Sequence, residues 1–165
     1  MRRLLGSVLL AASSLLLLAE SAPTLRMPGQ AARAVEPAAL LGSDRSDVKV
    51  EDGKGGATVY GGLPLLAVLE KNGLDLKDMN AERKVAPAIV VATARDGYTV
   101  VFSVGELLLH RSDPKVYLVA EKSGAALPSN EGPVRLIVVG QRARSAYGLA
   151  QIELKYLADN PPAKH

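Results

Sequence analysis

Short apolar runs and two-residue alternation along the chain predict a protein made mainly of β-strands. The six or seven predicted strands cover residues 48–50, 57–60, 89–93, 98–104, 115–122, 134–139 and 152–156. Residues 89–93 are almost uniformly apolar, so this strand is expected to be buried on both faces, and the Asp96-Gly97 pair that follows is a strong hairpin-turn signal. Residues 152–156 alternate between apolar and charged side chains, as expected of a half-buried final strand.

Two short helices are predicted between the strands, over residues 65–72 and 104–109. Pro64 at the first turn and Gly73 just past the end delimit the first helix. Ser103 and Glu106 have capping-box spacing at the start of the second helix. Residues 75–86 are polar and predict an irregular connection. Short, predominantly antiparallel strands with two brief helices indicate an α+β, mainly β domain.

The N-terminal segment has the organisation of a secretory signal peptide. Arg2-Arg3 precedes an apolar run over residues 4–19, and Ala19 and Ser21 form a small-x-small cleavage pattern. The run is shorter than the roughly 20 residues that a membrane-spanning helix needs, so we expect a cleaved signal rather than a retained anchor. Cleavage is expected after Ser21, with an alternative site after Ala34. The mature protein is then expected in the periplasm or outside the cell, with no transmembrane segment.

These patterns divide the chain into four parts. Residues 1–21 are the predicted signal peptide, and residues 22–47 hold three prolines and no apolar period, which indicates a flexible lead-in. Residues 48–157 are the predicted folded domain, of the size of one ordinary domain. Residues 158–165 are polar with two prolines and are expected to fray as a C-terminal tail.

Composition limits how such a domain is held together and what it binds. The chain contains no cysteine, no tryptophan and one phenylalanine, so the core must be built from Val, Leu, Ile and Ala without a disulfide. Removal of residues 1–21 leaves 18 basic and 16 acidic side chains, a net charge of about +2. This small excess is not clustered, which argues against nucleic-acid binding.

No motif of a catalytic or metal-binding centre is present in the sequence. There are two histidines: His165 is the last residue, and His110 follows a predicted helix, beside Arg111 and Asp113. A histidine in this position is favoured by the helix dipole and needs no metal to explain it. No nucleophile motif and no pair of facing carboxylates for general acid–base chemistry can be recognised. We therefore predict no catalytic residue and no metal ligand.

One polar cluster, residues 140–145, lies between two apolar strands. It contains Gly140, Arg142 and Arg144. Guanidinium groups on a loop after a buried strand can hold a phosphate or carboxylate through bidentate, charge-assisted hydrogen bonds. These three residues are therefore the predicted ligand-binding residues. The alternative is a solvated loop with two ordinary surface charges.

Four segments of the chain, the third of them in two parts, follow in order the pattern of a known family. They are residues 60–69 with Gly73 (YGGLPLLAVL…G), 95–107 (RDGYTVVFSVGEL), 116–120 (VYLVA), 127–140 (LPSNEGPVRLIVVG) and 143–154. They resemble the GxPLxxLL…AG, DGY…F…EL, LPxxxGPLRLVVPG and AR…V…IEL elements of the molybdopterin-binding domain of the sulfite oxidase family. The resemblance covers roughly residues 48–157 and implies that family's mixed sheet with short helices.

The resemblance also implies a cofactor, and the chain departs from the family at the residues that hold it. In family enzymes a cysteine thiolate ligates molybdenum, and Arg, Lys and His side chains hold the pterin phosphate. This chain has no cysteine, and Tyr147 stands where the ARxVK element has its lysine. Arg144 alone carries over as a phosphate contact. Molybdopterin is thus implied by resemblance only.

The function implied is an exported, non-catalytic binding or accessory module whose partner is an envelope protein or a small anionic ligand. One alternative is a pterin-cofactor-binding component of a periplasmic molybdenum oxidoreductase system. Another is an envelope structural or adhesion domain.

Overall fold

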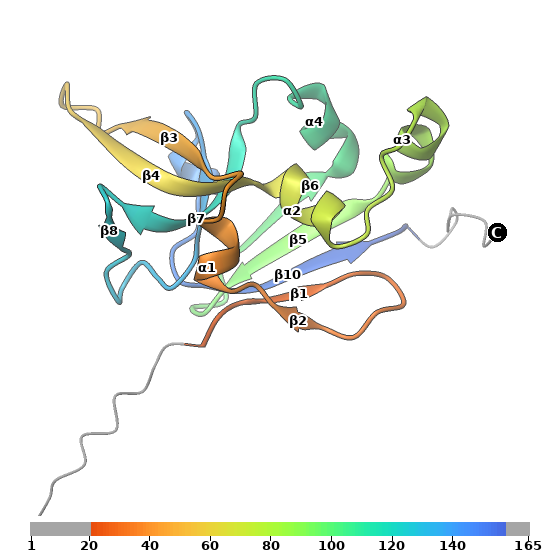
Figure 1. Cartoon of the computed structure of the whole chain (residues 1–165), viewed down its shortest axis with the longest axis horizontal. Helices are drawn as coiled ribbons and strands as arrows, with labels where there is room; N and C mark the ends of the chain where they lie inside the picture. The colour runs from red at the N-terminus through yellow and green to blue at the C-terminus, as the bar shows by residue number, and fades with distance from the viewer. Residues whose placement is uncertain (1–20, 158–165) are drawn as a thin grey trace, which may run out of the picture.

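Two β-sheets and four short helices make up residues 21–157, the part of the chain that the computed structural model describes (Figure 1). The first sheet has the order β2-β1-β10-β5-β6 and consists of β1 (Thr24–Arg26), β2 (Arg33–Ala34), β5 (Ile89–Ala94), β6 (Thr99–Ser103) and β10 (Leu149–Lys155). The second has the order β3-β4-β7-β8, with β9 also paired to β7. Its strands are β3 (Ser46–Glu51), β4 (Ala57–Pro64), β7 (Val116–Lys122), β8 (Ala125–Ala126) and β9 (Arg135–Val138).

The helices are short and lie at the strand ends. They are α1 (Pro37–Leu40), α2 (Leu65–Lys71), α3 (Met79–Val85) and α4 (Val104–Leu109), and a 3₁₀ turn η1 spans Arg142–Arg144. Only β1 and β10 pair in parallel; the other strand pairs of the described residues are antiparallel. The predicted α+β, mainly β class is therefore confirmed.

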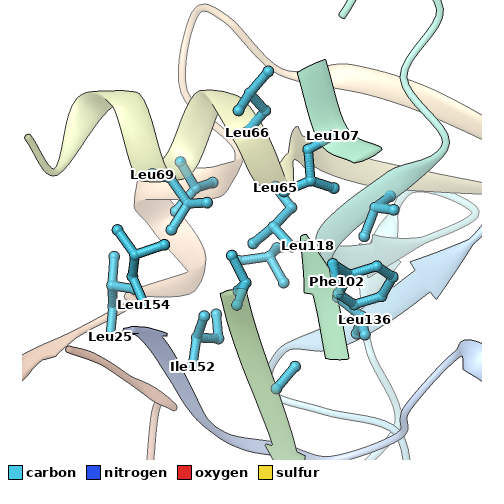
Figure 2. Close-up of a cluster of buried hydrophobic side chains, with 14 of the residues drawn as sticks. Leu25, Leu65, Leu66, Leu69, Phe102, Leu107, Leu118, Leu136, Ile152 and Leu154 are labelled. Atoms are coloured by element: carbon cyan, nitrogen blue, oxygen red, sulfur yellow. The ribbon is translucent and has the colours of Figure 1, made fainter. Parts of the chain in front are cut away.

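One apolar core lies between the two sheets and under α2. Leu65 and Leu69 of α2 are completely buried, as is Leu118 of β7. Figure 2 shows Leu65 and Leu69 on the side of α2 that faces Leu118, Ile152 and Leu154. Both sheets thus place apolar side chains against the same helix, and full burial stabilises the fold by about 1.5–3 kcal/mol for each leucine.

The second sheet is buried on its other face as well. Tyr60 of β4, Val119 of β7 and Ile137 of β9 form a smaller apolar cluster with Val48 of β3. All four residues of β9 are buried for this reason. A strand covered on both faces carries a continuous apolar run rather than an alternating one, which is the pattern that predicted this strand.

The predicted hairpin and helices agree closely with the structure. β5 and β6 pair across a turn that includes Asp96-Gly97. The Ser103 hydroxyl accepts a 2.9 Å hydrogen bond from the backbone N–H of Glu106 and caps α4. One prediction for β5 was wrong: Val90, Ala92 and Ala94 are buried, but the residues between them are partly exposed. Apolar composition alone does not distinguish a half-covered face from a covered one.

The flexible lead-in predicted for residues 22–47 is contradicted by the structure. This segment contains β1, β2, α1 and the first residues of β3, and Leu25, Val35 and Leu40 belong to the main core. β1 is held by parallel pairing with β10. Elements of two to four residues are too short to show a hydrophobic period, which is why the sequence pattern missed them.

The irregular connection predicted for residues 75–86 is also wrong in part, because α3 lies within it. The Asp78 side chain accepts hydrogen bonds of 2.9 Å from the backbone N–H groups of Asn80 and Ala81, and so caps this helix. Ala81 and Val85 supply its only buried side chains. Two apolar positions in seven residues give too weak a pattern to predict a helix, although the capping aspartate was a usable signal.

Within residues 21–157, no helix has the length and apolar character needed to cross a membrane. The predicted C-terminal tail and nearly all of the predicted signal peptide lie outside the described residues. Both therefore stay predictions from the sequence.

Leu25→Ala tests whether the N-terminal segment is part of the fold. Leu25 is 2% exposed in the core beside β10, so its truncation should lower the free energy of unfolding by about 2–4 kcal/mol. Arg26→Ala, at the exposed neighbouring position, is the control and should change it by under about 0.5 kcal/mol. Chemical denaturation measures both. Equal, negligible effects would mean that residues 22–47 do not contribute to the folded domain.

Candidate functional site

A cavity of about 260 Å³ lies between α2, α4 and the start of β7. Its volume is slightly below the range of about 300–1,000 Å³ that is typical of small-molecule sites. The apolar part of its wall consists of Pro64, Leu66, Ala67, Leu107, Pro114, Val116 and Val138. The polar part consists of Glu70, Glu106, His110, Arg111, Lys115 and Gln141. A mainly apolar hollow with a few convergent polar groups is the usual form of a ligand site.

The path of β4 into α2 builds one side of this cavity. Gly62 lies so close to β7 that a Cβ at this position would be 2.0 Å from the backbone oxygen of Leu118. Only glycine lets the two strands approach this closely. β4 ends at Pro64, and α2 begins at the next residue. The helix then directs Leu65 into the core, while Leu66 lies on the side of the helix nearer Leu107 (Figure 2). Leu66 and Leu107 are both buried, and both line the cavity.

The two basic side chains of the cavity wall already have carboxylate partners. Arg111 Nη1 lies 2.5 Å from Glu82 Oε1, which belongs to α3. Lys115 forms an ion pair with Asp113, and this contact holds the pKa of Asp113 below its ordinary value. Each cation would therefore share its charge between this carboxylate and any ligand anion.

Arg144, a predicted site residue, forms an ion pair with the wall of the cavity but does not line it. Its Nη1 lies 2.6 Å from Glu106 Oε1, and its Nη2 donates to the backbone oxygen of Val101 at 2.9 Å. The guanidinium also lies over the Phe102 ring, 4.4 Å from its centroid. The hydrogen bond from Arg144 is the main reason why the pKa of Glu106 is lowered, with burial opposing it.

The other two predicted site residues lie elsewhere on the same loop. Arg142 is exposed and donates a 3.0 Å hydrogen bond to the backbone oxygen of Glu51 on β3. Gly140 is exposed in the turn after β9, with a φ of 75°. The structure therefore gives Arg142 and Arg144 separate partners, and neither lines the cavity. Gln141, which lies between Gly140 and Arg142 in the sequence, does line it.

A buried charge cluster in the second sheet was missed by sequence reasoning. The Nη1 atom of Arg135, on β9, lies 2.7 Å from Glu131 Oε2. The same nitrogen donates a 2.9 Å hydrogen bond to the Tyr60 hydroxyl. Glu131 also accepts from Lys122 at 2.5 Å. The Tyr147 ring covers the guanidinium of Arg135, whose Cζ atom lies 3.9 Å from the ring centroid. A single arginine within the apolar run of residues 134–139 was the signal that could have indicated this cluster, because an arginine is rarely buried without a partner.

The cluster keeps Glu131 ionised in a buried position. Burial is the largest single effect and raises the pKa of this carboxyl, but the hydrogen bond from Lys122 and the charge of Arg135 outweigh it, so the pKa is lowered overall. The Nε atom of Arg135 is buried and has no hydrogen-bond partner. The charged side chains of Glu131 and Arg135 are both buried and join residues of β4, β7 and β9, so we interpret the cluster as a support for these strands.

Residues 21–157 contain no cluster of metal-binding side chains. No three His, Cys, Asp or Glu side chains in that range are grouped closely enough to hold a metal ion. His110 follows the last residue of α4, as its sequence position predicted, and lies exposed at the cavity mouth. His165, the second histidine, lies outside the described residues.

Glu131→Gln tests the charge cluster through its pH dependence. Because the folded-state pKa of Glu131 is lowered, its contribution to stability is complete above the ordinary carboxyl range and is lost as the pH falls through the folded-state value. The variant should therefore be less stable than the parent at pH 7, and the difference should shrink toward pH 3. Glu36→Gln, at an exposed position, is the control for loss of one charge. Denaturation curves across this range measure the effect, and a pH-independent difference would contradict it.

Comparison with known proteins adds no assignment to this geometry. No protein-family model matches the chain, and no curated protein is similar to it at a significant level. The resemblance to the sulfite oxidase family therefore stays a prediction from the sequence. Any function has to be argued from the cavity and from the charges around it, because function depends on the site rather than on the fold.

Proposed function

We propose that this protein is an exported, non-catalytic binding or accessory module that keeps the molybdopterin-binding architecture of the sulfite oxidase family. We further propose that the cavity between α2 and α4 is its ligand site. The observation that carries this proposal is a cavity of about 260 Å³ with a mainly apolar wall that also includes six polar side chains. A site of this kind binds a small molecule by burying its apolar surface and orienting its polar end.

Two carboxylates at the cavity favour binding over proton-transfer chemistry. Glu106 lines the cavity, and Asp113 pairs with the wall residue Lys115. Both carboxylates are ion-paired, and the pKa of each is lowered. A general acid needs a pKa near the working pH, whereas these carboxylates stay ionised at neutral pH. No serine or threonine lines the cavity, and the chain has no cysteine. The wall therefore offers no hydroxyl or thiol nucleophile.

The residues present do not fit a molybdenum–pterin cofactor held as in family enzymes. The thiolate ligand is missing because the chain lacks cysteine, and the described residues provide no group of side chains for a metal. Arg144, the one residue carried over as a phosphate contact, is bound to Glu106. Arg142 points to Glu51 instead. These contacts favour the hypothesis of a non-catalytic accessory module over that of a pterin-cofactor-binding component.

Cofactor loading separates these two readings directly. When the protein is purified from a host that makes molybdopterin, we expect neither stoichiometric molybdenum by elemental analysis nor pterin fluorescence after extraction. The measurement uses folded protein, verified by its thermal unfolding transition. One pterin for each chain, lost in an Arg144→Ala variant but retained in Arg26→Ala, would overturn the non-catalytic reading.

The ligand site itself can be tested by filling the cavity. Ala67 lines it from the partly exposed side of α2, so Ala67→Phe should occupy the space without entering the core. A small apolar probe such as 2-phenylethanol should shift the amide resonances of α2 and α4 in the parent protein, and this response should fall at least tenfold in the variant. Ala39→Phe, at an exposed position of α1, should bind the probe as the parent does. Equal binding by all three proteins would place the probe elsewhere and contradict the proposed site.

A further inference from the structure

One carboxylate in the cavity wall is left without a close partner. Among the described residues, Glu70 pairs with Arg111, but the distance from Glu70 Oε1 to Arg111 Nη2 is 3.6 Å, which is longer than a hydrogen bond. The other terminal nitrogen of Arg111, Nη1, lies only 2.5 Å from Glu82 Oε1. The Glu70 side chain is about half exposed, at 47%. Its oxygens can therefore accept hydrogen bonds from a ligand in the cavity.

The basic groups of the wall are in the opposite situation. Arg111 and Lys115 are bound closely by Glu82 and Asp113. A ligand anion would have to share one of these cations with the carboxylate that already holds it. A ligand cation needs only Glu70, and no short ion pair has to break. The cost of binding thus differs with the sign of the ligand's charge.

The net charge around the cavity also favours a cationic ligand. The charged residues of the wall and their direct ion-pair partners comprise four carboxylates and three permanent cations: Glu70, Glu82, Glu106 and Asp113 against Arg111, Lys115 and Arg144. The excess of one negative charge favours a single positive charge in the site.

The apolar side chains of the wall limit what kind of cation fits. Leu66, Leu107 and Val116 contribute apolar surface that an inorganic ion would leave unused. A hydrocarbon group that covers this surface gains roughly 25 cal/mol for each Å² removed from water. One carboxylate with a loose partner is also too few for a metal ion, which needs several oxygen ligands.

We propose that the cavity between α2 and α4 binds a small organic ammonium ion, whose apolar body packs on Leu66, Leu107 and Val116 and whose charged group is held by Glu70. This inference rests on the proposed function, since it names the ligand class of the same cavity. It replaces the small anionic ligand expected at the arginine loop with a cation at a different place.

Three probes of nearly equal size test the ligand class. They are phenethylamine, 2-phenylethanol and phenylacetate, which differ mainly in carrying a positive, a zero and a negative charge. Each is titrated into the isotope-labelled, purified protein, and the dissociation constant is read from amide shifts of α2 and α4. We expect phenethylamine to bind about fivefold more tightly than the alcohol, the size of effect that a partly exposed charge pair gives. Phenylacetate should bind more weakly than the alcohol.

Two variants show whether Glu70 is responsible. Glu70→Gln keeps the size of the side chain and should bring the affinity for phenethylamine to that for the alcohol, with the alcohol's own affinity unchanged. Glu153→Gln removes one carboxylate that pairs with Lys155 on β10 and does not line the cavity. It should keep the fivefold preference.

The outcomes separate the two proposals. If the alcohol binds but phenylacetate binds as well as phenethylamine, or if Glu70→Gln leaves the preference intact, the ligand class is wrong while the cavity remains the binding site. If no probe shifts the amides of α2 and α4, the proposed function fails together with the ligand class.

Discussion

The burial of α2 between the two sheets is the interaction on which the rest of the structure depends. Leu65 and Leu69 are completely buried against strands of both sheets, so the helix fixes how the sheets meet (Figure 2). This packing also sets the rotation of α2 about its axis. Leu66, Ala67 and Glu70 of the same helix line the cavity, so the placement of α2 on the core also positions this part of the wall. The cavity is thus a consequence of how the core is filled.

Much of this fold could be predicted from the sequence because its longer elements have clear hydrophobic patterns. α4 begins and ends where the Ser103–Glu106 capping spacing predicted, and β9 follows its apolar run. The pattern failed where elements are very short. β1 has three residues and is held by parallel pairing with β10, a partner more than 100 residues away in the chain. Backbone pairing of that kind leaves almost no trace in local sequence, so the segment before residue 48 was taken as flexible.

The site could be predicted less well than the fold, since it depends on which charges find partners. Arg144 was predicted from its place on a loop after a buried strand, but the sequence did not show that Glu106, 38 residues earlier, pairs with it. Glu70 was not predicted as a site residue. It is left with the longer contact because Arg111 lies closer to Glu82, and that choice depends on where α3 lies relative to α4. Neither arrangement has a sequence motif, because both arise from tertiary packing.

We propose that ligands bind between α2 and α4 rather than at the arginine loop. Intermolecular NOEs between a bound aromatic probe and the methyl groups of the protein locate the probe directly. We expect NOEs from the ring to methyl groups of Leu66, Leu107 and Val138, which line the cavity. NOEs to Ala143 of the η1 turn and to the ring of Tyr147, with none to these three residues, would contradict it.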